Sequence, residues 1–254
     1  MSTNKGKVAI ITGATGGIGF AVAKRLGEDG YTVVLNGIED EAGAARVKEL
    51  TDAGIDASYY GFDVTKEDAV TSNIKAIGEK YGKIDVLVNN AGGLGGRARF
   101  EEMTTEFYRF VMALNLDSVF FASRAAIPFL KNGDNPTIIN YTSNAGWNAG
   151  GPGAGIYGTS KAGVHTITRA LAKDLAEYGI RVNAVSPGTI DTPFHQQIKS
   201  TKPEVFASWA NNIMLGRLGQ PEDVAGVVSF LASKDAAFLT AETVQVGGGQ
   251  ALGI

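Results

Sequence analysis

Residues 8–19 read VAIITGATGGIG, a short apolar run followed by four glycines within eight residues. β-Branched residues before a cluster of glycines predict a buried strand that ends in a tight turn. The amphipathic stretch after Gly19 predicts a helix, so the turn leads into a helix N-terminus, where free N–H groups attract phosphate. Gly13, Gly17 and Gly19 match a G-x-x-x-G-x-G variant of the dinucleotide-binding pattern. A tight turn without a ligand is the alternative, and the downstream sequence decides between the two.

The apolar run of residues 8–11 is the first of several such runs. Most are apolar throughout rather than alternating, as expected for strands that are covered on both faces. Amphipathic stretches of helix length separate them, and this alternation predicts βαβ units with a parallel sheet. We expect an α/β fold over residues 1–254: a single-domain, Rossmann-type, doubly wound parallel sheet of about seven strands with helices on both faces. The runs begin at Val8, Thr32, Ala57, Ile84, Thr137, Ile180 and Thr243.

The composition is that of an ordinary globular protein, with 44% hydrophobic residues and a formal net charge of −3. A weakly acidic chain lacks the basic surface that nucleic-acid binding requires. The absence of cysteine excludes disulfides, thiolate metal sites and cysteine nucleophiles. No uninterrupted apolar run reaches the length of a membrane span, and the first run is too short for a signal peptide. We expect a cytoplasmic protein without metal, nucleic-acid or membrane partners.

One segment departs from the alternation of strand and helix. Residues 191–212, DTPFHQQIKSTKPEVFASWANN, separate the sixth run from the helix expected after Pro221. Long excursions in compact domains are usually lids or binding loops. We therefore expect residues 191–212 to form a substrate-binding loop or lid within the single domain.

Four polar residues carry candidate chemistry. Tyr157 and Lys161 stand four residues apart at the start of an expected helix, so their side chains share one face. Taken alone, such a pair is usually an incidental surface pair. Ser143, however, stands at the carboxyl end of the fifth run, where ligands bind in open parallel sheets. Asn115 lies inside an expected helix, where asparagine is a poor helix former and needs a reason.

Together these residues resemble the short-chain dehydrogenase/reductase family, over essentially the full length of the chain. The resemblance implies an NAD(P)(H)-dependent oxidoreductase that acts on a CH–OH group, interconverting an alcohol and a ketone or aldehyde by hydride transfer. It implies a catalytic tetrad of Asn115, Ser143, Tyr157 and Lys161. The motifs that carry it occur in order: TGATGGIG at Thr12, DV at Asp63, NNAG at Asn89, YGTSK at Tyr157, VSPG at Val185 and a late GRLGQPEDVAGVVSFLAS.

The chemistry explains the residue types of this tetrad. A free tyrosine has a pKa near 10, too high for ready proton exchange at neutral pH. We expect the ammonium of Lys161 to favour the phenolate and to lower the pKa of Tyr157. By resemblance, Tyr157 protonates the carbonyl oxygen in reduction, and Ser143 donates a hydrogen bond to the same oxygen. Lys161 also holds the nicotinamide ribose, and Asn115 positions a water in the proton relay.

The spacing between Ser143 and Tyr157 is one residue longer than is usual in the family. An additional residue in the glycine-rich loop between them is the simplest interpretation. The alternative is that Thr142 or Asn144 shares the task of the serine.

By resemblance, the cofactor-binding residues follow the first, second, third, fourth and sixth runs, together with the tyrosine and lysine of the tetrad. Those after the third run border the adenine, and those after the sixth run border the nicotinamide. They are Gly13, Thr15, Gly16, Gly17, Ile18, Gly19, Gly37, Ile38, Asp63, Val64, Asn90, Ala91, Gly92, Tyr157, Lys161, Pro187, Gly188, Ile190 and Thr192.

The choice between NAD(H) and NADP(H) depends on the charge near the second run. NAD-preferring members usually place an aspartate after it, which holds the ribose hydroxyls and repels a 2′-phosphate. NADP-preferring members place arginine or lysine just after it or inside the glycine turn. This chain has Gly37 at the aspartate position, Ile38 at the first cation position and Gly16 at the second. With Glu39 and two further carboxylates close by, electrostatics favour NAD(H) over NADP(H).

The substrate should meet residues that follow the fourth and fifth runs and residues of the 191–212 segment. Their polarity argues against a steroid or a long acyl chain, which requires an apolar pocket. Two arginines could together bind one carboxylate group. We therefore expect the substrate to be a small polar carbonyl compound, and in the more specific form of this hypothesis it is acidic. The candidate substrates are a keto sugar, a sugar acid or uronate, or a hydroxy acid. For each single residue, a solvated surface position is the alternative. The candidates are Arg97, Arg99, Ser143, Trp147, Asn148, Tyr157 and His195.

Other functions remain open. A catalytically silent, nucleotide-sensing protein of the same fold should lack part of the tetrad, whereas this chain has all four residues. A reductase of an apolar or acyl carbonyl compound is a further alternative. A nucleotide-sugar epimerase or dehydratase should have a longer substrate domain after the last run. The resemblance also implies association into a homotetramer or a dimer.

Overall fold

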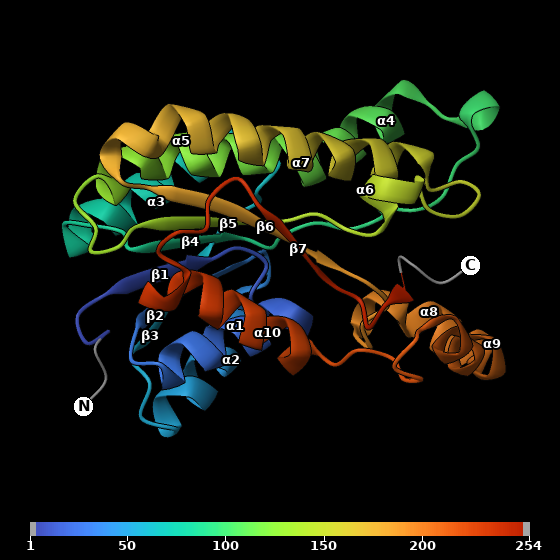
Figure 1. The fold of residues 1–254 in the computed structure, drawn as a ribbon, viewed down its shortest axis with the longest axis horizontal. Coiled ribbons are helices and arrows are strands. Elements are labelled where there is room, and N and C mark those ends of the chain that lie inside the picture. Colours follow the sequence, from blue (N-terminus) through green and yellow to red (C-terminus); the bar gives the residue numbers. More distant parts are fainter. Residues whose placement is uncertain (1–3, 251–254) are drawn as a thin grey trace.

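In the computed structural model, which describes residues 4–250, seven strands form one parallel sheet in the order β3-β2-β1-β4-β5-β6-β7 (Figure 1). The predicted doubly wound α/β fold is confirmed, and each predicted run contains one strand. The strands are β1 (Val8–Ile11), β2 (Thr32–Gly37), β3 (Ala57–Gly61), β4 (Val86–Asn89), β5 (Thr137–Tyr141), β6 (Arg181–Pro187) and β7 (Thr243–Val246).

Helices cover both faces of the sheet (Figure 1). One layer holds α1 (Gly17–Glu28), α2 (Asp40–Asp52) and α10 (Pro221–Ala232). The other holds α3 (Glu67–Tyr81), α4 (Thr105–Met112), α5 (Ser118–Leu130), the short α6 (Ala145–Asn148) and α7 (Gly155–Leu175). Short turns η1 (Phe100–Glu102), η3 (Ala176–Tyr178) and η6 (Lys234–Ala236) complete the connections.

Each central strand contributes to two cores, because successive side chains of a strand point to opposite faces. Ile11 of β1 packs with Leu26 and Val224 on the side of α1 and α10. Its neighbour Ile10 packs with Ile74 on the side of α3 and α5. All these side chains are buried, and burial stabilises the fold by about 1.5–3 kcal/mol for each. Burial on both faces explains why the runs are apolar throughout.

The order of the strands reverses at β1, which lies between β2 and β4. In open α/β sheets, ligands bind beyond the carboxyl ends of the strands at such a switch point. Here the glycine turn after β1 is tied to β2, because the Gly13 N–H donates to Asn36 Oδ1 (3.2 Å) and the Ala14 N–H donates to the Asn36 carbonyl (2.7 Å). The turn is therefore fixed at the place where a cofactor binds in this architecture.

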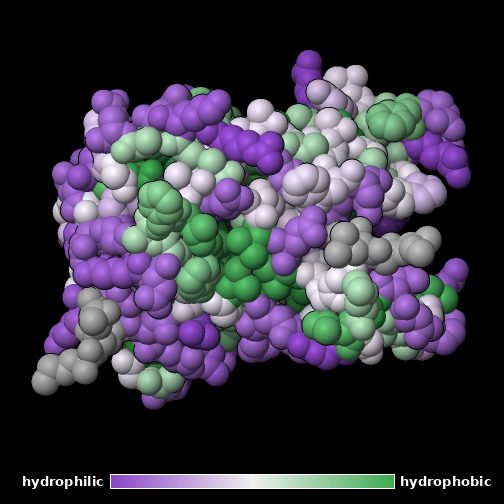
Figure 2. All heavy atoms as spheres, in the orientation of Figure 1, coloured by the Kyte–Doolittle hydropathy of each residue, from purple (hydrophilic) through white to green (hydrophobic). Residues whose placement is uncertain are grey.

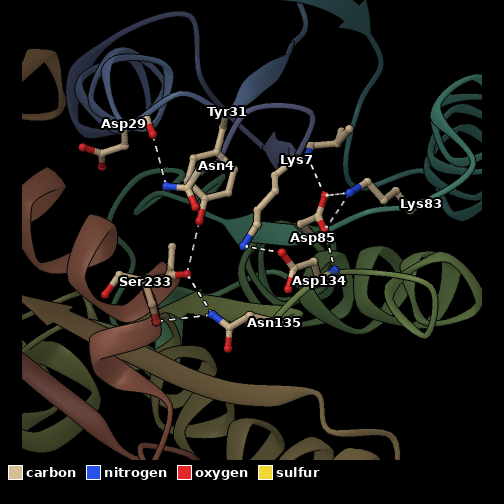
Figure 3. Close-up of polar contacts among 11 residues, drawn as sticks. Asn4, Lys7, Asp29, Tyr31, Lys83, Asp85, Asp134, Asn135 and Ser233 are labelled. Atoms are coloured by element: carbon tan, nitrogen blue, oxygen red, sulfur yellow. Dashed lines mark hydrogen bonds and ion pairs between the residues drawn. The ribbon is translucent and has the colours of Figure 1, made fainter. Parts of the chain in front are cut away.

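The amino ends of the strands are closed by a buried carboxylate, that of Asp85 (Figure 3). Its Oδ2 accepts from the Val8 N–H (2.7 Å) and its Oδ1 from the Asp134 N–H (2.6 Å). Lys83 Nζ lies 3.3 Å from Oδ2. Lys7, itself buried, pairs with Asp134 beside it, at 3.1 Å. Asp85 thus joins β1, β4 and the start of β5 at the end of the sheet opposite to the switch point.

Helices α4 and α5 are joined by a π-helical turn, η2 (Ala113–Asp117), into one helix from Thr105 to Leu130. This helix is long and apolar enough to cross a membrane by length and composition, although it has no uninterrupted apolar run of that length. It packs against α3 and α7 in one layer of the fold, and it buries the polar side chains of Asn115 and Ser123. One face of the helix is therefore packed into the fold, and 39% of its apolar stretch is buried.

The 191–212 segment forms a small helical excursion beside the carboxyl ends of the strands, separate from both main layers (Figure 1). It comprises η4 (Pro193–His195), α8 (Gln196–Thr201), α9 (Pro203–Ser208) and η5 (Trp209–Asn212). Phe206 is buried inside it, packed against the rings of His195 and Trp209. The segment is therefore folded around its own aromatic cluster and does not lie flat as an extended loop.

Candidate active site

A cavity of about 900 Å³ opens beyond the carboxyl ends of β1, β2, β4, β5 and β6. This volume lies in the range of small-molecule and cofactor sites. The glycine turn, the ends of these strands, the start of α7 and the 191–212 segment line it. Every residue expected to bind the cofactor lies along the cavity except Asp63, whose carboxylate instead accepts from the Thr65 N–H (2.9 Å) and hydroxyl (2.8 Å) before α3.

The glycine turn fits a pyrophosphate. Gly13 and Gly17 have φ of +64° and +53°, a region that favours glycine. A Cβ on Gly19 would lie 2.4 Å from the Gly13 carbonyl oxygen, so no larger residue fits there. The N-cap residue of α1, Gly16, offers no side-chain hydrogen bond, so the first N–H groups of the helix face the cavity without a side-chain partner. Such a terminus suits an anionic ligand.

Tyr157, Lys161 and Ser143 meet at the other end of the cavity. Tyr157 and Lys161 lie on adjacent turns of α7, and Lys161 Nζ lies 5.9 Å from the centre of the Tyr157 ring. Lys161 is 3% exposed, and its ammonium donates to the carbonyl oxygen of Tyr141 at 2.9 Å. The end of β5 therefore orients the lysine.

The expected lowering of the Tyr157 pKa by Lys161 is not found. Burial raises the pKa of Tyr157 above its ordinary value of 10, and a hydrogen bond with Ser143 offsets part of this rise. Burial also lowers the pKa of Lys161 to about 8. The phenolate of Tyr157 and the ammonium of Lys161 both lose hydration on burial, which disfavours each charged form. The ammonium is directed at the carbonyl oxygen of Tyr141. Ser143, rather than Lys161, is the neighbour that favours the phenolate in this structure.

Asn115 lies in η2, fully buried and behind the cavity wall. Its Oδ1 accepts from the Gly93 N–H, and its Nδ2 donates to the carbonyls of Gly93 and Val111, each at 2.9 Å. A Cβ on Gly92 would lie 2.8 Å from Asn115 Oδ1 and 3.0 Å from Lys161 Nζ. The asparagine thus fixes the backbone after β4 against the lysine. The π-helical turn explains why it is tolerated inside a helix.

The chain between Ser143 and Tyr157 forms α6 and a tight loop after it. Ala149 and Gly150 there have positive φ, 64° and 70°. Thr142 is buried and donates to the Val185 carbonyl (3.3 Å), and Asn144 Nδ2 contacts Gln250 Oε1 (3.4 Å). Ser143 alone of these three hydrogen-bonds with Tyr157. The structure therefore favours the serine over its two neighbours.

The substrate candidates divide into two groups. Arg97, Asn148 and His195 line the cavity, as do Ser143 and Tyr157. Arg99 is exposed outside it, and the Trp147 ring packs against His165, 4.3 Å between centres, away from the cavity. Several further residues line the cavity that the sequence did not single out as site residues: Asn36, Leu94, Leu114, Phe194, Trp209 and Asn212. Of these, Phe194, Trp209 and Asn212 stand inside the predicted 191–212 segment, whose length was the available signal. Glu39, expected near the cofactor for its charge, also lines the cavity.

Comparisons with known proteins agree with this geometry. The family model described as Enoyl-(Acyl carrier protein) reductase matches residues 13–251. The chain is 38% identical to 3-oxoacyl-(acyl-carrier-protein) reductase FabG of Thermotoga maritima, over 96% of this chain and 98% of that protein. It is 38% identical to an (S)-acetoin-forming diacetyl reductase of Staphylococcus aureus, over 96% and 97%. A solved structure of the NADH-dependent reductase A1-R′, responsible for alginate metabolism, superposes with a TM-score of 0.89 at 37% identity, covering 98% and 99%.

Proposed function

The chain belongs to the short-chain dehydrogenase/reductase family, and from this premise we propose that it is an NAD(H)-dependent oxidoreductase that interconverts a small polar alcohol and the corresponding ketone or aldehyde. One observation carries the proposal. Tyr157, Ser143 and Lys161 meet at one end of a cavity whose other end is a glycine turn suited to a dinucleotide. A nucleotide sensor has no need for a buried lysine beside a tyrosine and a serine.

The residues divide the chemistry as follows. A bound nicotinamide supplies or accepts the hydride. The glycine turn and the N-terminus of α1 bind its pyrophosphate. Ser143 hydrogen-bonds the substrate oxygen, and the Tyr157 hydroxyl gives that oxygen a proton in reduction or takes one in oxidation. Lys161 holds the ribose and supplies positive charge near the phenol. Asn115 keeps the backbone at Gly92 and Gly93 in place beside the lysine.

We expect opposite pH dependence in the two directions. Reduction needs the protonated phenol, and burial raises the Tyr157 pKa above 10, so the phenol stays protonated through neutral pH. The rate should therefore stay level until Lys161, whose pKa is about 8, begins to lose its charge. Oxidation needs the phenolate, whose share rises about tenfold per pH unit below the Tyr157 pKa, so its rate should rise with pH over the same range. Initial rates of one alcohol–ketone pair in both directions give the two profiles. An oxidation rate that is independent of pH would contradict the role of Tyr157.

The preference for NAD(H) rests on the end of β2. Gly37 cannot be replaced by the usual aspartate without movement, because its Cβ would lie 2.5 Å from Thr15 Cγ2. Glu39 lines the cavity two residues later and supplies the negative charge. One cation, that of Arg46, approaches the glycine turn, donating to the Thr15 carbonyl (3.2 Å), but it is paired with Glu49 (2.6 Å) and does not line the cavity. The charge that faces the adenosine ribose is therefore negative.

Replacing Gly16 by arginine should improve NADPH binding. Gly16 is extended (φ −173°), a conformation open to any residue, and nothing lies within 4 Å of a Cβ there. A hydrogen bond to a charged phosphate contributes about 1.5–3 kcal/mol, or about 10- to 100-fold. Fluorescence titration should show the Kd for NADPH falling by this factor in Gly16→Arg, with the Kd for NADH little changed. Tighter binding of NADPH than NADH by the unaltered protein would overturn the proposed preference.

The proposed substrate is a small polar carbonyl compound, such as a keto sugar, a sugar acid or a hydroxy acid. Asn148, Asn212, Arg97 and His195 give the substrate end of the cavity its polarity. The competing candidate is a 3-oxoacyl compound, favoured by the likeness to the Thermotoga maritima reductase. The test is a spectrophotometric screen of NADH and NADPH oxidation over keto sugars, uronic acids, 2- and 3-oxo acids and 3-oxoacyl thioesters. Turnover of thioesters alone would favour the acyl substrate, and no turnover at all would favour a nucleotide sensor.

We also propose a homotetramer or dimer located in the cytoplasm. Hydrophobic side chains gather in the middle of the face shown in Figure 2, over the β7 edge of the sheet. Phe230 is 43% exposed and Phe238 is fully exposed beside this edge. An uncovered edge strand with apolar neighbours favours pairing with a second chain. Tyr108, Phe110 and Phe120 give the α4–α5 helix a second apolar surface.

A further inference from the structure

Tyrosine aside, the ionisable acid and base side chains that line the substrate end of the cavity, among the described residues, are all bases. Among the described residues, the charged or ionisable acid and base side chains that line the cavity are Glu39, Arg97, Lys161 and His195. Glu39 follows β2 and belongs to the adenosine end. The other three line the substrate end, where no carboxylate of the described residues lines the wall. Lys161 already has a place in the catalytic machinery, so Arg97 and His195 are the two bases whose role is left unexplained.

We propose that Arg97 and His195, which approach the substrate space from the β4–α4 connection and from the 191–212 segment, form a two-point clamp for a carboxylate of the substrate. This inference rests on the proposed function and narrows it. It selects an oxo acid or a sugar acid over an uncharged ketone or keto sugar, and it replaces the pairing of Arg97 with Arg99 that the sequence suggested.

Arg97 is held in place without being neutralised. Its Nη1 donates to the Pro152 carbonyl at 3.0 Å, which fixes the guanidinium against the glycine-rich loop before α7. A Cβ on Gly153 would lie 3.1 Å from Arg97 Cβ, so this approach is close. Arg97 is exposed at the mouth of the cavity, and no carboxylate pairs with it in the described part of the chain. The remaining N–H groups of the guanidinium are free to bind an anion from the cavity.

His195 is oriented by the aromatic cluster of its own segment. The centre of its ring lies 4.9 Å from that of Phe194, 5.3 Å from Trp209 and 5.7 Å from Phe206. The three surrounding rings leave the imidazole little freedom to move. A fixed imidazole is suited to donate an N–H to a ligand oxygen.

The two groups lie within electrostatic reach of each other. Burial lowers the pKa of His195, and the positive charges of Lys199 and Arg97 lower it further. Asp191 raises it, but this carboxylate is already paired with Lys199 at 2.5 Å. The charged groups that face His195 are thus Arg97, Asp191 and Lys199. An anion placed between Arg97 and His195 relieves their repulsion and favours protonation of the imidazole.

This arrangement predicts that the binding of an acidic substrate is coupled to the uptake of a proton by His195. In the free protein His195 is neutral at pH 7, and a bound carboxylate raises its pKa, so an acidic substrate takes up a proton as it binds. Its KM should therefore be constant at low pH and rise by up to about tenfold per unit through neutral pH. An uncharged analogue has no such linkage, and its KM should stay level.

The experiment compares matched acids and esters: acetoacetate with methyl acetoacetate, and levulinate with methyl levulinate, each at several pH values with NADH. The acids should show KM values about 10- to 100-fold lower than their esters. Arg97→Ala should raise the KM of the acids by this factor and leave the esters within about threefold. His195→Asn, which keeps the size of the side chain and cannot titrate, should remove the rise of KM with pH. Arg99→Ala should leave the ratio of acid to ester unchanged.

Several outcomes would overturn the clamp. Equal KM values for acid and ester, an unchanged ratio in Arg97→Ala, or a ratio that collapses only in Arg99→Ala would each do so. Turnover of both esters without preference for the acids refutes the clamp while the proposed oxidoreductase function stands. If no compound is turned over, calorimetric titration of the NADH-loaded protein with levulinate and its ester still decides. Tighter binding of levulinate, lost in Arg97→Ala, supports the clamp, and equal binding refutes it.

Discussion

Replacing Tyr157 by phenylalanine is expected to lower kcat by about 10²- to 10⁴-fold, the range of general acid–base catalysis by one positioned side chain. The phenol is the only group of the proposed tetrad that exchanges its proton with the substrate oxygen. The ring itself remains, so the cavity keeps its shape, and the Kd for NADH should change by less than about threefold. Steady-state rates and a fluorescence titration measure the two quantities on the same preparation.

Tyr178→Phe is the matched control, because this tyrosine is exposed outside the cavity and its loss of a hydroxyl should leave kcat unchanged. A Tyr157→Phe protein that keeps most of its kcat would show that another group moves the proton. An equal loss in kcat and in NADH affinity would assign Tyr157 to cofactor binding instead.

The second large effect concerns stability and lies at the opposite end of the sheet. Asp85→Asn should lower the free energy of unfolding by about 3–5 kcal/mol, because it removes one partner of a buried, hydrogen-bonded ion pair. The carboxylate accepts from the N–H groups of Val8 and Asp134 and pairs with Lys83 (Figure 3). An amide keeps the shape but has one acceptor oxygen, and its NH₂ faces a donor. For a domain of this size the midpoint of thermal unfolding should fall by about 10 °C.

Asp52→Ala is the control for this change. Asp52 pairs with Lys48 on the surface of α2, with side chains 64% and 74% exposed, and such a pair contributes about 0–1 kcal/mol. Circular dichroism melts of both variants give the comparison. Similar midpoints for Asp85→Asn and the unaltered protein would show that the carboxylate is not needed to join β1, β4 and β5.

The strands, and the helices that cover both faces of the sheet, could be predicted from the sequence. Strands that are buried on both faces are apolar throughout, and this pattern can be read directly from the sequence. The apolar character of residues 8–11 and of Ile138 and Ile139 follows directly from helices on either side. Asp85 could not be predicted in its role, because an aspartate beside an apolar run reads equally as a turn residue. Only the sheet brings it against Val8 and Asp134.

The candidate active site, like the fold, has features that could be predicted from the sequence and features that could not. The spacing of Tyr157 and Lys161 predicted a shared helix face, which is a local property. The direction of the lysine ammonium toward Tyr141 is a tertiary property, and so is the sign of the Tyr157 pKa shift. The sequence does not distinguish Arg97 from Arg99. In the structure Arg97 lines the cavity and donates a hydrogen bond to the Pro152 carbonyl, whereas Arg99 does not line the cavity. Asn115 was identified as out of place, but the π-helical turn that accommodates it leaves no sequence signal of its own.

The central claim is that this protein transfers a hydride between a nicotinamide and a carbonyl carbon. The most direct measurement uses NADH labelled with deuterium at C4 in both positions, together with the carbonyl compound that oxidises NADH fastest in the screen. Mass spectrometry of the product alcohol should show one deuterium on the carbinol carbon for each NADH consumed, with transfer slowed by about 10²- to 10⁴-fold in Tyr157→Phe. An unlabelled product, or no oxidation of bound NADH by any carbonyl compound, would contradict the account.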